Sequence, residues 1–145
     1  MSDPIKYMVD KDGGELRSPI YPSDAGMDVI VIENVLCLPH SVIQVPIGIR
    51  VVPPPGTCFT FITRSSAVLQ GLFVVPTLID GGYRGPLFLF VMNVWDKYIK
   101  IVSGTRIAQI LLLPNMVEGR EIIQINRLPD GDRGTNGFGS SGGAT

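Results

Sequence analysis

The segment SVIQVPIGIRVVPPPGTCFTFIT, residues 41–63, contains the pattern that decides the fold. Apolar runs of strand length alternate in it with Gly and Pro, and VPPPG at residues 52–56 is typical of a tight turn. The pattern recurs in DVIVI (28–32), LFVVPTLI (72–79), PLFLFVMNVW (86–95), YIKIV (98–102), RIAQILLL (106–113) and EIIQI (121–125). Short Val-, Ile- and Phe-rich runs separated by turn residues predict an all-β sandwich or barrel.

Two local signals refine this prediction. RSSAVLQG, residues 64–71, predicts one short helical turn, with Ser65 or Ser66 as the N-cap and Gly71 as the C-terminal stop. LIDGGYRG, residues 78–85, predicts a hairpin, because Asp-Gly-Gly between two apolar runs tolerates the positive φ of hairpin turns.

The composition places bounds on the class of protein. A chain of 145 residues with 45% hydrophobic residues suits one domain with a sizeable core. The net charge of −1 gives no electrostatic support for nucleic acid or a membrane surface as a partner, and no apolar run approaches the length of a membrane span. The first residues, MSDPIKYMVD, lack a secretory signal pattern. We expect an intracellular, cytoplasmic protein, with the nucleus as the alternative for a eukaryotic or viral source.

The rarer residue types and the C-terminal composition give further expectations. Cys37 and Cys58 lie in apolar runs and are expected to be free core thiols, and His40 lacks neighbouring residues that would make a zinc site. Apolar residues nearly stop after residue 129. We therefore expect a barrel domain over residues 1–129 and a flexible Gly/Ser-rich arm over residues 130–145.

Four clusters in the barrel carry groups suited to chemistry. Asp28 follows a bend at Gly26, and Arg64 precedes two serines whose helix start could bind an anion. Asp80 ends an apolar run, where a carboxylate that reaches a water could act as a general base. Gln109 shares a strand face with Ile107 and Leu111, and a buried amide without a partner costs about 1–3 kcal/mol, so we expect it to contact something. Taken alone, each cluster also has a structural interpretation, as a turn, a helix cap or a structural contact.

The arm is the fifth cluster. Arg133 could bind phosphate, Phe138 could stack on a base, and Ser140 and Ser141 could donate hydrogen bonds, while the surrounding glycines allow close approach of the backbone. The alternative is a disordered linker or a remnant of cloning, which would rarely contain both Arg and Phe.

In this order, AGMD, RSSA, LIDGGYRG, GTRIAQ and RGTNGFGSSG resemble the five motifs of the trimeric deoxyuridine triphosphate nucleotidohydrolases (dUTPases). The resemblance covers roughly residues 25–142. It implies a distorted jelly-roll β-barrel with one short helix and a flexible C-terminal arm, assembled as a homotrimer with shared active sites. It further implies hydrolysis of dUTP to dUMP and pyrophosphate, which limits uracil in DNA and supplies dUMP for dTTP synthesis.

The resemblance assigns catalytic roles to three residues. Asp80 would hold and deprotonate the water that attacks the α-phosphorus, and Gln109 would contact the phosphates and that water. Mg²⁺ would be held mainly by the three phosphates, with Asp28 acting on it through ordered water.

The resemblance also assigns contacts to the substrate. Tyr83 would pack against the deoxyribose and exclude a 2′-hydroxyl, Arg133 would pair with the γ-phosphate, and Phe138 would stack over uracil. The remaining substrate contacts that it implies are Arg64, Ser65, Ser66, Thr77, Ile79, Gly139, Ser140 and Ser141.

The chain departs from the family pattern at some positions, and two other functions stay open. Val74, Thr77 and Asn136 replace residues that are common in the family, the first two near the uracil position. One alternative is a dCTP deaminase-related enzyme, which shares the barrel but needs a differently placed glutamate. The other is a non-catalytic nucleotide-binding protein with a regulatory or interaction role.

Overall fold

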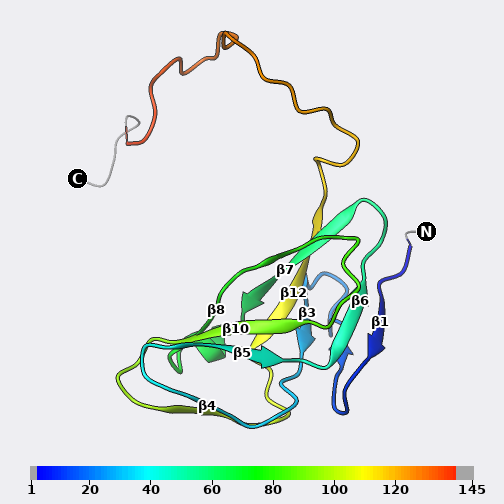
Figure 1. Cartoon of the computed structure of the whole chain (residues 1–145), viewed down its shortest axis with the longest axis vertical. Helices are drawn as coiled ribbons and strands as arrows, with labels where there is room; N and C mark the ends of the chain where they lie inside the picture. Colours follow the sequence, from blue (N-terminus) through cyan, green and yellow to red (C-terminus); the bar gives the residue numbers. More distant parts are fainter. Residues whose placement is uncertain (1–2, 140–145) are drawn as a thin grey trace.

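The computed structural model describes residues 3–139, and it is nearly all β (Figure 1). The predicted all-β jelly-roll class is confirmed. The elements are β1 (Lys6–Val9), β2 (Leu16–Arg17), β3 (Gly26–Val29), β4 (Val35–Cys37), β5 (Val42–Pro46), β6 (Ile49–Val52), β7 (Thr57–Thr63), α1 (Ser65–Val68), β8 (Leu72–Val74), β9 (Leu78–Ile79), β10 (Phe88–Asn93), β11 (Ile99–Ile101) and β12 (Ala108–Pro114).

The largest sheet has the strand order β2-β3-β12-β7-β9, with every pair antiparallel. Successive side chains of a strand point to opposite faces of a sheet. In β7 and β12 this alternation buries Phe59, Phe61, Ala108 and Ile110 on one face. The other face of the same strands is left for polar groups such as Gln109.

Smaller sheets close the other side of the core. They have the orders β5-β10-β8, β11-β4 and β1-β6. Val45 of β5, Leu89 and Val91 of β10, and Val74 of β8 belong to the same buried cluster as the large sheet's inward residues. One continuous apolar core therefore fixes the position of the large sheet, whose outward face carries the candidate site. None of the helices found in residues 3–139 is long and apolar enough to span a membrane.

The predicted helical turn forms, but its cap differs from the prediction. Arg64 is the N-cap residue, with extended backbone (φ −71°, ψ 143°) and no side-chain capping bond, so the prediction of Ser65 or Ser66 as the cap is wrong. Both serines already lie inside the first turn of α1. Gly71 has φ +85° and terminates the turn as predicted.

The predicted hairpin is correct as a turn and wrong as a strand pairing. The Tyr83 N–H donates to the Asp80 carbonyl (3.1 Å), which closes the turn. However, β9 pairs with β7, whereas β10 pairs with β5 and β8. Neither Gly81 nor Gly82 has a positive φ. Gly81 is needed for another reason, because a Cβ there would press against the carbonyl oxygen of Thr57.

The segment after β12 leaves the barrel. No strand or helix forms in the described residues after Pro114, residues 116–139 are all exposed, and the chain runs away from the sheets (Figure 1). The strand predicted for EIIQI (121–125) is therefore wrong for this single chain, since nothing lies beside it to pair with. The expected boundary between residues 129 and 130 stays a prediction. Residues 116–129 share the exposure of the arm. Cys37 and Cys58 are both free thiols, as predicted, but only Cys37 lies in the core, whereas Cys58 is half-buried.

Substitution of Gly71 tests the contact that packs the end of the short helix against Trp95. A Cβ at Gly71 would collide with the Trp95 ring, and its φ is +85°; Gly104 has φ +92° but nothing within 4 Å. Left-handed backbone alone costs a non-glycine residue about 1–2 kcal/mol. We expect Gly104→Ala to lower the free energy of unfolding by about that amount and Gly71→Ala by about 2–4 kcal/mol. Urea unfolding at one protein concentration checks this. Equal losses in the two variants would show that the Trp95 contact carries no constraint.

Candidate active site

A row of residues across the large sheet builds the first part of the site. Arg17 of β2 lies opposite Asp28 of β3, Asp28 lies opposite Gln109 of β12, and Gln109 lies opposite Ile62 of β7. Residues opposite one another in a sheet point to the same face. All four line a pocket of about 650 Å³ on the outer face, together with Arg64 and Arg106.

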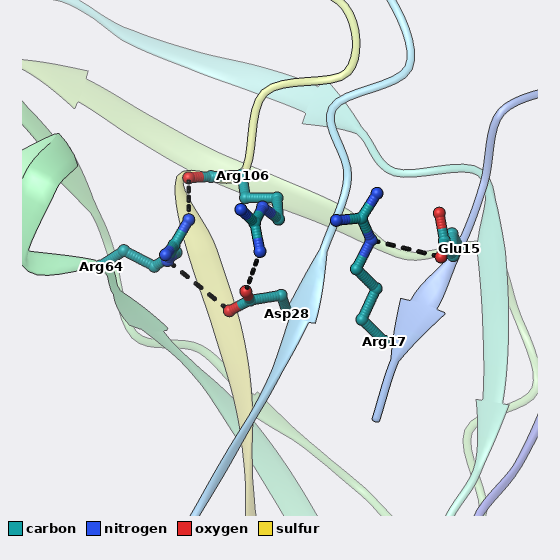
Figure 2. A network of polar contacts seen from close by, with 5 residues as sticks. All are labelled: Glu15, Arg17, Asp28, Arg64 and Arg106. Atoms are coloured by element: carbon teal, nitrogen blue, oxygen red, sulfur yellow. Dashed lines mark hydrogen bonds and ion pairs between the residues drawn. The ribbon is translucent and has the colours of Figure 1, made fainter. Parts of the chain in front are cut away.

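Asp28 is the electrostatic centre of this pocket. Its Oδ2 accepts from Arg106 Nη1 at 3.0 Å, and its Oδ1 lies 3.6 Å from Arg64 Nε, as Figure 2 shows. Arg64 Nη1 also donates to the Arg106 carbonyl at 3.2 Å. The Asp28 side chain is only 21% exposed, so these charges interact through a medium less polar than bulk water. The carboxylate thus holds two guanidinium groups at the pocket wall.

Gln109 lies directly over Gly26. A Cβ at Gly26 would coincide with the Gln109 amide, so this position requires glycine. Gln109 and Leu111 face the pocket as the strand alternation predicts, whereas Ile107 is buried in the core. Ile107 precedes the first residue of β12, where the alternation does not yet hold. The amide therefore faces a cavity rather than the apolar core.

The second part of the site lies around the turn after β9. Thr77, Ile79, Asp80 and Tyr83 line one pocket of about 400 Å³, together with Phe88 and other residues of that region. The Tyr83 hydroxyl donates to the Pro86 carbonyl at 3.0 Å, which fixes its ring across the turn. Asp80 is exposed beside this largely apolar pocket.

The two parts lie at opposite ends of β7. Ile79 is opposite Phe59, and Thr63, which precedes Arg64, is opposite Ala108. From residue 59 to residue 63 the strand rises about 13 Å, and Asp80 continues in the opposite direction. Asp80 is accordingly absent from the pocket that Asp28, Arg64 and Gln109 line. One chain does not bring its own Asp80 to its own Gln109.

The arm residues form a third group. Arg133 Nε donates to the Asn136 carbonyl at 3.1 Å within the arm, and the Phe138 side chain is fully exposed, with φ 23°. Gly139 follows with φ +89°. Ser140 and Ser141 lie outside the described residues. The arm does not contact either pocket of its own chain in the residues that the structure describes.

Two arginines of the Asp28 pocket have no predicted role. Arg106 belongs to the GTRIAQ stretch, and the register of β12 with β3 brings it to Asp28. Arg17 lies on a strand of two residues, which is too short to show alternation in the sequence. Only the pairing of β2 with β3 reveals that it faces the pocket.

Metal-binding groups are sparse on the described part of the chain. Residues 3–139 contain no cluster of three or more His, Cys, Asp or Glu side chains that could hold a metal ion. His40 pairs with Asp96 at the surface, away from both pockets. Burial raises the pKa of the Cys37 thiol, as expected for an inert core cysteine.

Comparison with known proteins decides the family. The dUTPase family model matches residues 13–142. The chain belongs to the dUTPase family. This confirms the predicted family and, with it, the prediction of an enzyme.

Two curated relatives are deoxyuridine 5′-triphosphate nucleotidohydrolases. The one from Leifsonia xyli subsp. xyli is 38% identical and covers 87% of this chain and 86% of its own length. The one from Clostridium novyi is 30% identical, and the match covers 95% of this chain and 99% of that protein.

Solved structures support the fold of this dUTPase-family chain. A variant of the Staphylococcus bacteriophage 80alpha dUTPase with dUpNHpp has a TM-score of 0.87 at 22% identity, covering 97% of this chain and 99% of that chain. A variant of the dUTPase from phage phi11 of S. aureus, which coordinates a structural Mg(II) ion, has a TM-score of 0.78 at 18% identity, covering 86% and 98%.

Asp28 offers a direct test of the pocket's electrostatics. Asp28→Asn leaves Arg64 and Arg106 facing each other without their carboxylate. We expect the free energy of unfolding to fall by about 1–2 kcal/mol, because the charges are partly desolvated. Glu15→Gln removes the partner of an exposed arginine and should cost less than about 0.5 kcal/mol. Urea midpoints measure both variants. A smaller loss for Asp28→Asn than for Glu15→Gln would contradict the central role of Asp28.

Proposed function

We propose that this chain is a dUTP diphosphatase, which hydrolyses dUTP to dUMP and pyrophosphate in a shared site of a homotrimer. Membership of the family supports the substrate class. The observation that carries the proposal is the division of the site into two complementary parts. One part presents guanidinium and amide donors suited to phosphates, and the other presents a carboxylate beside a largely apolar pocket suited to a base and sugar.

The phosphate chain would lie in the Asp28 pocket. Arg64 and Arg106 supply guanidinium groups that Asp28 holds in place, and Gln109 supplies an amide that Gly26 allows to lie flat against the sheet. Ser65 and Ser66 begin α1 next to Arg64 and are exposed, so their hydroxyl and backbone N–H groups are free to reach phosphate oxygens. These groups bind and orient the triphosphate for in-line attack.

The nucleoside would lie against the turn that carries Asp80. Thr77 and Ile79 provide backbone groups for the uracil edge, and the Tyr83 ring packs against the deoxyribose. The hydrogen bond to the Pro86 carbonyl holds this ring, which would then exclude a 2′-hydroxyl. Cytosine presents the opposite donor pattern and would leave buried groups unpaired, which discriminates strongly against it.

Asp80 is the proposed general base. Its carboxylate accepts a proton from a water as the water oxygen forms a bond to the α-phosphorus. The bond from the α-phosphorus to the bridging oxygen breaks, and pyrophosphate leaves with that electron pair. Gln109, contributed by a neighbouring chain, orients the same water.

Magnesium enters this proposal through the substrate. Both oxygens of Asp28 are engaged by arginines, and residues 3–139 contain no carboxylate cluster for direct ligation. A carboxylate oxygen has a second lone pair, so Asp28 keeps an acceptor for ordered water near an ion held by the phosphates. Mg²⁺ bound in this way would neutralise phosphate charge and restrict the conformation of the triphosphate.

The same geometry supports the proposed assembly of several subunits. Because Asp80 and Gln109 are separated along β7, a complete site requires Asp80 from one subunit and Gln109 from another. The segment after β12, which ends in the arm, would supply a third part. It leaves its own barrel, and Ile122 in this segment is 90% exposed, so the apolar EIIQI stretch is free to contact a neighbouring subunit. We further propose that the enzyme acts inside the cell, where its nucleotide substrate is found.

Mixing two inactive variants tests the shared site. We expect Asp80→Asn to bind dUTP without turnover, and Gln109→Ala to lose most turnover. Unfolding and refolding the two together should restore about a quarter of wild-type activity, since about one site in four receives both intact residues.

Matched mixing controls make the result specific. Gln109→Ala mixed with Arg64→Ala should restore nothing, because both residues belong to the same part of the site. No recovery in the first mixture, with trimers present by light scattering, would contradict the shared site. A wild-type protein that releases no pyrophosphate from dUTP would overturn the proposed function itself.

Deleting residues 130–145 tests the arm. We expect a folded trimer whose kcat/KM for dUTP falls by about 100-fold or more, because the arm's contacts to bound nucleotide are lost and water is no longer excluded. Pyrophosphate release and circular dichroism measure the two properties. Full activity of the truncated protein would remove Arg133 and Phe138 from the proposed site.

A further inference from the structure

We propose that Arg17 is an additional substrate-binding residue, which binds the triphosphate chain at the side of the pocket opposite Arg64. This inference rests on the proposed function and adds a residue to it. None of the motifs that identify the family contains Arg17.

The position of Arg17 is fixed by two strands. It lies opposite Asp28 in the pairing of β2 with β3, and it lines the same pocket as Asp28, Arg64 and Gln109. Figure 2 shows its guanidinium beside the Asp28 strand, between this strand and Glu15. The strand order places β2 at one edge of the pocket, with β3 and β12 between it and β7.

The hydrogen bonds of Arg17 leave its outer donors available. Its Nε donates to Glu15 Oε1 at 3.2 Å. Neither Nη1 nor Nη2 of Arg17 donates to any of residues 3–139. A guanidinium anchored through Nε with both terminal nitrogens free presents the planar fork that phosphate oxygens accept.

The charge balance of the pocket supports the same role. Arg64 and Arg106 are both committed to Asp28. The carboxylate that pairs with Arg17 belongs to Glu15, which is not part of the pocket lining. The lining therefore holds three arginines against the carboxylates of Asp24 and Asp28, and neither of these two carboxylates pairs with Arg17. A highly charged triphosphate would be attracted to this point.

A purely structural role does not account for Arg17. Its side chain is 45% exposed, and Glu15 is 47% exposed. Exposed ion pairs of this kind contribute little to folding. The Arg17 side chain is thus free to serve a ligand without being required by the fold.

The experiment compares Arg17→Gln and Arg17→Lys with Lys100→Gln. Lys100 is exposed on β11, outside the sheet that carries the pocket, and removing its charge controls for the overall electrostatic change. We expect Arg17→Gln to raise the KM for dUTP about tenfold with kcat changed less than about twofold, and to weaken binding of inorganic triphosphate by about the same factor. Arg17→Lys should recover part of the loss, because it keeps the charge and loses the fork. Lys100→Gln should match the wild type.

The outcomes separate the two proposals. Unchanged KM and triphosphate affinity in Arg17→Gln would overturn the role of Arg17, and so would a loss confined to kcat. An equal loss in Lys100→Gln would also overturn it, since any positive charge would then serve. If the wild type does not hydrolyse dUTP, the proposed function fails, while calorimetry with inorganic triphosphate still decides whether Arg17 binds a phosphate chain.

Discussion

Strand β7 sets the distance between the two parts of the site. Its pairing with β12 at one end supports the pocket of Asp28, Arg64 and Gln109, and its pairing with β9 at the other end supports the turn of Asp80. The strand is buried through Phe59 and Phe61, so neither end shifts without disturbing the core. A barrel built on this strand does not bring Asp80 and Gln109 together within one chain. In the site that we propose, one structural constraint therefore links assembly to catalysis.

The register between strands β3 and β12 determines which side chains lie on the outward face of the large sheet. A shift of one residue between β3 and β12 would turn Gln109 or Asp28 into the core. The buried residues Val29, Ala108 and Ile110 oppose such a shift, because their burial depends on the same register. The apolar face thus stabilises the placement of Arg17, Asp28 and Gln109 on the opposite face. Glycine at position 26 completes the arrangement by leaving room for the amide.

The sequence predicted the fold class well because most strands carry apolar runs bounded by turn residues. It also predicted that Gln109 shares a face with Leu111, since strand alternation alone decides this. It did not predict the partner of β9, because pairing between distant strands is set by the packed core rather than by local signals. EIIQI has a strand-like pattern, but a strand also needs a neighbour, and the single chain provides none. The sequence did not predict that Arg17 faces the pocket, because its strand of two residues is too short to show alternation.

The most direct test of the shared site is a crystal structure of the protein with a non-hydrolysable dUTP analogue. We predict a trimer in which the nucleoside lies against Asp80 and Tyr83 of one subunit, while the phosphates lie between Arg64 and Gln109 of a second subunit. An analogue bound entirely within one chain, or bound away from both pockets, would contradict it.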